Sequence, residues 1–131
     1  MATIRSARAD PQPTRRVLVV DDHLDTVDSL AMLLKTMGHE VQFAITGTAA
    51  VNIARAFRPE IVLLDFGLPD VKGDLVARRI RAERGLENVR IVVITGRSED
   101  EDRQGALDAG CESYHVKPLD SGVLEQLLAK P

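Results

Sequence analysis

Three short runs of apolar residues stand out along the chain, and each is bounded by polar or turn-forming residues. They are VLVV at 17–20, IVLL at 61–64 and IVVI at 91–94. Runs of this length that are rich in β-branched residues are typical of strands buried on both faces, as in a parallel sheet. Two weaker candidates, EVQFA at 40–44 and SYHV at 113–116, are more polar. This polarity favours a place at the edges of the sheet.

The segments between these runs carry apolar residues three and four positions apart, which is the spacing of one face of an α-helix. Helices are predicted over 23–37, 47–57, 73–83, 99–109 and 120–129. Gly38 should end the first, Pro59 should stop the second, and Asp120 or Ser121 should cap the last. The segment 99–109 is polar except for Ala106, Leu107 and Ala109. This helix is therefore predicted to bury only a thin stripe and to be loosely held.

Strict alternation of strands and helices predicts a doubly wound α/β fold, in which a five-stranded parallel sheet has helices on both faces. The chain has 131 residues, of which 44% are hydrophobic, enough for one core. We expect a single domain over 16–130. Residues 1–15 are polar or small, include Pro11 and Pro13, and are predicted to form a flexible tail.

Charge and composition exclude several classes of protein. The formal net charge is −3 with acids and bases interspersed, so no basic surface for nucleic acid or anionic lipid is expected. The apolar runs are far shorter than a membrane span. Cys111 is the single cysteine, which excludes a disulfide within the monomer. The first residues, MATIRSARADPQPTRR, lack the apolar core of a secretion signal, so a cytoplasmic location is expected.

A polar residue closes each predicted buried strand. Asp21 and Asp22 follow the first run, Asp65 the second and Thr95 the third, while Lys117 follows the last, weaker run. In open α/β sheets the functional crevice lies outside the carboxyl ends of the strands. We therefore expect these side chains to meet at one rim of the sheet.

These side chains are chemically complementary. Two carboxylates at ~4 Å repel by roughly 4 kcal/mol at an effective dielectric of 20, so the converging acids need a cation. Mg²⁺ fits best, with Mn²⁺ as a possible substitute, because it takes few protein carboxylates and shares its site with phosphate oxygens. Lys117 adds a positive charge suited to a phosphoryl group, Thr95 a hydroxyl donor, and Gly96 an open backbone N–H. Asp65 is then placed to be a nucleophile, which the metal and the lysine keep ionised.

This set of residues resembles the receiver domain of two-component response regulators over residues 16–129. The resemblance rests on Asp21-Asp22, Asp65, Thr95-Gly96, Tyr114 and Lys117-Pro118, in that order and at those strand ends. It implies the flavodoxin-like strand order 2-1-3-4-5. It also implies that Asp65 accepts a phosphoryl group from the phosphohistidine of a histidine kinase or a histidine phosphotransfer protein.

The resemblance also implies a role for each site residue. Asp22, Asp65 and the backbone carbonyl of Gly67 would ligate Mg²⁺, with Asp21 acting through water. The phosphoryl oxygens would be bound by Thr95, Gly96 and Lys117, the last followed by Pro118 in its loop. Thr95 and Tyr114 would form a switch that shifts the helix at 99–109 and the neighbouring strand to control partner binding. Gly67 and Arg97 would flank the phosphoryl group and tune its hydrolysis.

Other functions remain open from sequence alone. The chain could be a receiver-like scaffold that binds partners without phosphorylation. A Mg²⁺-dependent aspartyl phosphatase of the haloacid-dehalogenase type would have a second acid where this chain has Gly67, and no G-x-G-x-x-G motif supports dinucleotide binding. Beyond its own phosphorylation and dephosphorylation no enzyme activity is expected. The downstream partner or output domain stays unknown, as does the choice between a monomer and a phosphorylation-dependent homodimer.

Taken singly, several of these residues have simpler explanations. Asp22 could be a helix N-cap, and Tyr114 a packed aromatic of an edge strand. His23, His39 and His115 show no metal-ligand spacing with cysteine, and we interpret them as surface or hydrogen-bonded residues.

Overall fold

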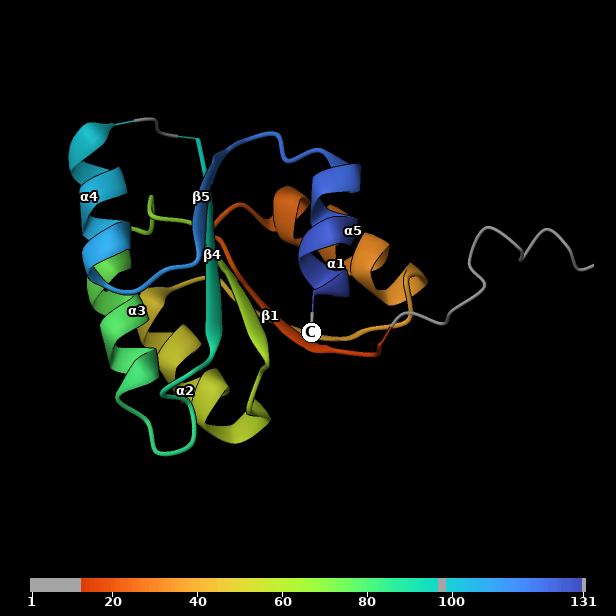
Figure 1. Ribbon diagram of the computed structural model, residues 1–131, viewed down its shortest axis with the longest axis horizontal. Helices are drawn as coiled ribbons and strands as arrows, with labels where there is room; N and C mark the ends of the chain where they lie inside the picture. The colour runs from red at the N-terminus through yellow and green to blue at the C-terminus, as the bar shows by residue number, and fades with distance from the viewer. Residues whose placement is uncertain (1–12, 97–98, 131) are drawn as a thin grey trace, which may run out of the picture.

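The computed structural model describes residues 13–96 and 99–130, and over these residues a parallel sheet lies between two layers of helices (Figure 1). The strands are β1 (Arg16–Val20), β2 (Glu40–Ala44), β3 (Ile61–Leu64), β4 (Arg90–Thr95) and β5 (Ser113–Val116). The helices are α1 (Leu24–Thr36), α2 (Gly47–Phe57), α3 (Gly73–Arg81), α4 (Asp100–Asp108) and α5 (Ser121–Ala129). Every predicted strand and helix is therefore confirmed, with ends that differ by at most two residues.

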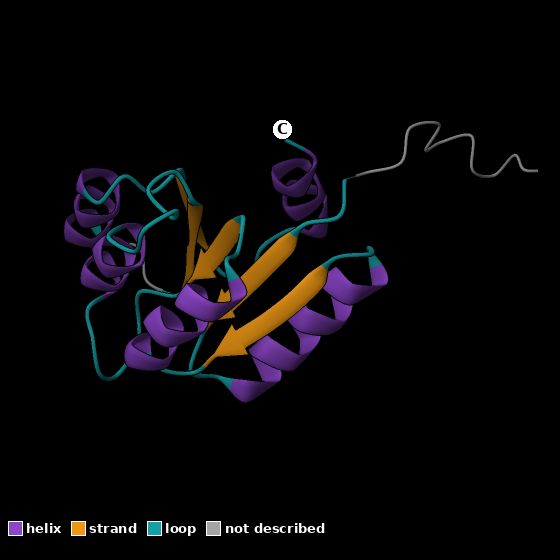
Figure 2. Cartoon of the chain, turned by 90° about the horizontal axis from the view of Figure 1, so that it is seen from below, coloured by secondary structure: helices purple, strands orange, loops and turns teal. Residues whose placement is uncertain are grey.

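The strand order is β2-β1-β3-β4-β5, and all neighbouring pairs are parallel. This confirms the predicted order, and Figure 2 shows the strands running in one direction. Since β1 and β3 are neighbours, the residues that follow them come together at one edge. The more polar strands β2 and β5 lie at the two edges of the sheet, as their sequences predict.

The two faces of the sheet carry two separate apolar cores. Val17 and Val19 of β1 pack with α1 and α5, while Leu18 and Val20 pack with α2, α3 and α4. Figure 1 shows the same division of the helices. Because consecutive side chains of a strand point to opposite faces, a strand covered on both sides must be apolar throughout. This explains why the central runs are continuous rather than alternating.

The helix α4 has the thinnest apolar contact, as predicted. Ala106 is its one buried residue, and Ala109 is buried just after its end. The prediction that Leu107 shares this buried stripe is wrong, because its side chain is 68% exposed. Ala106 and Ala109 lie three positions apart on one helix face, whereas Leu107 is turned about 100° away from Ala106.

The remaining sequence predictions have mixed outcomes. Asp120 rather than Ser121 is the N-cap of α5, and its side chain accepts a hydrogen bond from the Gly122 N–H at 2.8 Å. Residues 1–12 of the predicted tail lie outside the described residues, so their flexibility stays a prediction. Within 13–96 and 99–130, none of the helices has both the length and the apolar character that crossing a membrane requires.

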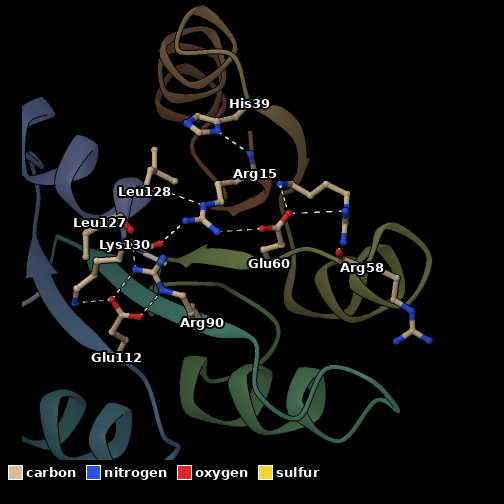
Figure 3. Close-up of polar contacts among 10 residues, drawn as sticks. Arg15, His39, Arg58, Glu60, Arg90, Glu112, Leu127, Leu128 and Lys130 are labelled. Atoms are coloured by element: carbon tan, nitrogen blue, oxygen red, sulfur yellow. Dashed lines mark hydrogen bonds and ion pairs between the residues drawn. The ribbon is translucent and has the colours of Figure 1, made fainter. Parts of the chain in front are cut away.

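Arg15, which the sequence places at the end of the tail, is bound to the domain. Its backbone N–H donates to His39 Nδ1 at 3.0 Å, and its guanidinium contacts Glu60 at 3.4 Å (Figure 3). The same guanidinium donates to the carbonyl of Leu128 at 3.1 Å and to that of Lys130. Arg15 thus joins the start of β1 to the last turn of α5.

A second arginine holds the same end of α5. Arg90, at the start of β4, makes two hydrogen bonds of 2.7 and 2.8 Å with the carboxylate of Glu112 and a third of 2.7 Å with the carbonyl of Leu127 (Figure 3). Lys130 Nζ lies 3.5 Å from Glu112. Since the last carbonyls of a helix have no partners within the helix, these arginines supply the missing donors.

The environment of His39 predicts a pH-dependent stability. Burial, together with the charge of Arg15, holds the pKa of His39 below its usual value of 6.5. The unfolded chain then binds more protons than the folded one near this pH. The stabilisation is therefore fully present above pH 6.5 and is lost as the pH falls toward the lowered pKa of the folded state.

We expect His39→Asn, which keeps an acceptor where Nδ1 lies, to remove this part of the pH dependence. Urea unfolding from pH 5 to pH 8 measures it. His39→Leu should instead cost about 1–3 kcal/mol across the range, because the Arg15 N–H would lose its acceptor. An Asn variant as pH-dependent as the wild type would contradict this account of His39.

Candidate functional site

The three predicted acids follow β1 and β3 and lie at the same edge of the sheet. The backbone N–H of Asp65 donates to the carbonyl of Val20 at 2.9 Å, so the pairing of β1 with β3 continues to the phosphoacceptor candidate. The N–H of Asp21 likewise donates to the carbonyl of Ala44, the last residue of β2, at 3.1 Å. Asp21 and Asp65 are each only 4% exposed, so their carboxylates stand at the boundary of the core.

Lys117 reaches both of these carboxylates. Its Nζ lies 2.5 Å from Asp21 Oδ2 and 3.1 Å from Asp65 Oδ2. Its backbone N–H donates to the carbonyl of Thr95 at 2.8 Å, which ties the loop after β5 to the end of β4. The following peptide bond, to Pro118, is cis. The structure thus brings Asp21, Asp65, Thr95 and Lys117 together, as the sequence predicts.

The charges at this site depend on one another. Burial tends to raise the pKa of Asp21, but hydrogen bonds from Lys117 and His23 outweigh burial and hold the pKa below its usual value. Burial tends to lower the pKa of Lys117, but Asp21 and Asp65 outweigh it and raise the pKa above its usual value. Asp21 and Lys117 therefore stay charged throughout the neutral range.

The acidic cluster is compatible with a divalent metal ion. One ligand atom from each of Asp21, Asp22, His23 and Asp65 can be chosen so that all lie within 4.8 Å of one another. Asp22 Oδ1 is buried, and its one near polar neighbour among the described ion pairs, His23 Nδ1 at 3.2 Å, does not have the geometry of a hydrogen bond. A buried carboxylate oxygen without a well-aligned hydrogen bond is a suitable ligand for a hard cation such as Mg²⁺.

His23 is the residue of this cluster that sequence reasoning missed. Its side chain is 68% exposed, and Nδ1 lies 3.1 Å from Asp21 Oδ1 and 3.2 Å from Asp22 Oδ1. Its backbone N–H also donates to Asp21 Oδ1 at 2.9 Å. The spacing of histidines relative to cysteine gives no indication that His23 belongs to the cluster. Its position next to two acids at the start of a helix does give one.

The two site glycines have clear surroundings. The Gly67 N–H donates to Asp65 Oδ1 at 2.8 Å, which fixes the orientation of the carboxylate. Gly96 faces open space, since no described atom lies within 4 Å of the place where a side chain would begin. The metal-ligand role of the Gly67 carbonyl and the phosphoryl-binding role of Gly96 stay predictions. Arg97 lies outside the described residues.

Tyr114 lies between the segment that follows β3 and α4. Its ring meets that of Phe66, the residue after Asp65, edge to face at 6.1 Å between centroids. The guanidinium of Arg103, from α4, lies 4.5 Å from the centre of the Tyr114 ring. Thr95, the other predicted switch residue, is fully buried. Nothing in the sequence indicated that Arg103 contacts Tyr114, because the two residues belong to different elements, α4 and β5.

A cleft of about 470 Å³ opens beside the carboxylates, between α1 and the loop after Lys117. Asp21, Asp65 and Lys117 share its lining with apolar side chains that include Leu33 and Leu119. Part of the site is thus reachable from outside.

Comparisons with known proteins point to one family. Residues 17–129 match the model of the response regulator receiver domain. The chain is 40% identical over 116 residues to the transcriptional regulatory protein PrrA of Mycobacterium leprae, an alignment that covers 88% of this chain and 47% of PrrA. The chain therefore spans about half the length of the curated relatives it matches.

Solved structures agree with this match. The receiver domain of sensor histidine kinase PA1611 from Pseudomonas aeruginosa PAO1, which has a magnesium ion coordinated in its active-site cleft, superimposes with a TM-score of 0.79 at 28% identity. That superposition covers 88% of this chain and 95% of the other. A receiver domain protein from Methanospirillum hungatei gives a TM-score of 0.81 at 27% identity and covers 88% and 91% of the two chains.

The family match covers most of the chain, and the strand order concerns the same part. The match extends from the second residue of β1 to the end of α5, and the acidic cluster lies inside it. The chain belongs to the family of response regulator receiver domains of two-component systems.

Proposed function

We propose that Asp65 accepts a phosphoryl group from the phosphohistidine of a histidine kinase or a histidine phosphotransfer protein. One observation carries the proposal: the Asp65 carboxylate shares the ammonium of Lys117 with Asp21 and lies within the acidic cluster at the mouth of a cleft. Phosphoryl transfer asks a protein mainly for position and for neutralised charge. These groups can supply both.

In the proposed step, a carboxylate oxygen of Asp65 attacks phosphorus as the bond from phosphorus to the donor imidazole breaks. The bonding electron pair goes to the imidazole nitrogen, which takes a proton from solvent. The Gly67 N–H, bound to Asp65 Oδ1 at 2.8 Å, orients the carboxylate during the attack. Lys117 and Thr95 then bind the phosphoryl oxygens, so that Lys117 exchanges a carboxylate partner for a phosphoryl oxygen.

Mg²⁺, or Mn²⁺ in its place, would be held by Asp22, Asp65 and the Gly67 carbonyl, with Asp21 acting through water. When bound, the ion would neutralise the phosphoryl oxygens and lower the repulsion between them and the carboxylates. The proposal rests on the donor set, because the carboxylate oxygens lie close together and the buried Asp22 Oδ1 makes no well-aligned hydrogen bond within the described part of the chain.

Phosphorylation would act on partners through Thr95, Tyr114 and α4. Thr95 would move toward the phosphoryl group, Tyr114 would follow, and α4 would shift with it. Two contacts support this order: Tyr114 touches both Phe66, beside the phosphoacceptor, and Arg103 of α4. The thin apolar stripe of α4 makes it the helix that moves at least cost.

The partners are part of the proposal. The relatives that the chain matches are named as transcriptional regulators and are about twice as long, so an output domain or a separate protein would receive the signal. We propose that the module works in the cytoplasm, as a monomer or as a homodimer formed on phosphorylation. The lone Cys111, with no second cysteine to pair with, suits such a reducing compartment.

Incubation with acetyl phosphate and Mg²⁺ should add one phosphoryl group to each chain, as measured by intact-mass spectrometry. The adduct should be absent in Asp65→Asn, because an amide is not nucleophilic enough to attack phosphorus, and absent when EDTA removes the metal.

Asp28→Asn, which changes an exposed aspartate of α1 outside the acidic cluster, is the matched control and should still accept the group. Continuous release of phosphate over many turnovers would instead point to a phosphatase. A folded wild type that takes up neither a phosphoryl group nor beryllofluoride would point to an unphosphorylated scaffold.

Beryllofluoride with Mg²⁺ should shift the amide NMR signals of the described parts of 95–116, because the side chains of Thr95 and Tyr114 would move together. In Thr95→Ala the signals near Gly67 should still move, whereas those of Tyr114 and α4 should move much less. Equal shifts at Tyr114 in both proteins would show that Thr95 does not link the site to α4.

A further inference from the structure

The loop between β3 and α3, residues 65–72, is tied to the start of α2 by one side chain. Asp70 Oδ1 accepts a hydrogen bond from the Gly47 N–H at 2.8 Å. Asp70 Oδ2 accepts from the Thr48 N–H and from Thr48 Oγ1, both at 3.1 Å. One carboxylate thus binds three donors on a helix that precedes it by more than 20 residues.

These bonds complete the N-terminus of α2. The first N–H groups of a helix have no partners within it, and the helix dipole favours a negative charge there. Thr46, the N-cap, accepts from the Ala49 N–H at 3.1 Å. Asp70 accepts hydrogen bonds from the other two N–H groups, those of Gly47 and Thr48. Two side chains from separate segments therefore satisfy the first N–H groups of α2.

The chain segments around Asp70 also pack closely against one another. A side chain at Gly47 would begin 2.8 Å from Val71 Cβ and 2.8 Å from Val76 Cγ2, so the loop and α3 lie directly on the backbone of α2. Nearer Asp65, the ring of Phe66 lies on Gly73 in the same way. The segment between these two contacts contains Gly67, whose N–H holds Asp65 Oδ1.

The same stretch of chain also reaches the other side of the site. Ala44 accepts the backbone hydrogen bond of Asp21, and Gly47, three residues later, binds Asp70. The segment 44–48 therefore connects the backbone of Asp21 to the loop that carries Gly67. The carboxylate of Asp70 completes this connection, because it joins the segment to the loop by hydrogen bonds.

We propose that Asp70 is a positioning residue for the metal and phosphoacceptor site, which it serves by fixing Gly67 relative to Asp21. The inference rests on the proposed function, since it takes the Gly67 carbonyl to be a metal ligand. Asp70 itself touches neither the metal nor the phosphoryl group. Its effect is to keep the loop in the arrangement in which Gly67 and the carboxylates can bind one ion together.

The test compares Mg²⁺ affinity in three variants of the full 131-residue chain. Asp70→Ala should weaken Mg²⁺ binding about 10-fold, within the range found for groups that orient metal ligands. Asp70→Asn keeps one acceptor for the Gly47 N–H and should recover part of the affinity. Titration with Mg²⁺ followed by the amide signals of Gly67 and Asp22 measures the dissociation constants well below the unfolding temperature.

Thr46→Ala is the matched control. It removes a hydrogen bond from the same helix end, that of the Ala49 N–H, but leaves the three hydrogen bonds of Asp70 in place. It should lower the unfolding temperature about as much as Asp70→Ala and leave Mg²⁺ affinity unchanged. Equal weakening in both variants would assign the effect to α2 and overturn the positioning role.

The outcomes separate this inference from the proposed function. If the wild type binds Mg²⁺ and accepts a phosphoryl group while Asp70→Ala does both equally well, the positioning role alone is wrong. If the folded wild type binds no Mg²⁺, the proposed function fails and the role of Asp70 fails with it.

Discussion

The interaction on which the site depends is the one between the Lys117 ammonium and the two carboxylates of Asp21 and Asp65. Both carboxylates end strands that are buried on both faces, so neither can turn far into solvent. One lysine cannot balance three acids, since Asp22 lies in the same cluster. The remaining negative charge makes the site receptive to a cation, and the mobility of a lysine side chain leaves room for a phosphoryl group.

The two ends of the sheet differ in how their charged groups are balanced. At the amino ends of the strands, Arg15 and Arg90 satisfy the last carbonyls of α5 and pair with Glu60 and Glu112 (Figure 3), so polar groups there have partners of opposite charge. At the carboxyl ends, acids gather around one lysine, and the buried Asp22 Oδ1 makes no well-aligned hydrogen bond among the described residues. Natural proteins keep such locally unfavourable arrangements where a ligand will complete them.

Sequence patterns predicted the fold and the residues that close the strands because both depend on local chemistry. A short continuous apolar run that is rich in β-branched residues favours an interior strand, and parallel strands bring their carboxyl ends to one edge. Contacts between distant segments were beyond reach: Arg103 over Tyr114, Asp70 on the start of α2, and Arg15 on α5 each join residues whose distance no single-sequence pattern encodes. Leu107 failed for a related reason, since apolar character alone does not fix which face of a marginal helix is covered.

The route from the site to the surface follows from one short stretch of sequence. Asp65 and Phe66 are adjacent, yet consecutive residues at the end of a strand point to opposite faces of the sheet. Asp65 meets Lys117, while Phe66 meets Tyr114, whose other partner is Arg103 of α4. A displacement of the Asp65–Phe66 segment, such as the proposed phosphorylation would cause, would therefore reach α4 through packed rings rather than through the backbone. Because α4 buries only Ala106 along its length, it offers less resistance to such a displacement than the helices that carry the two cores.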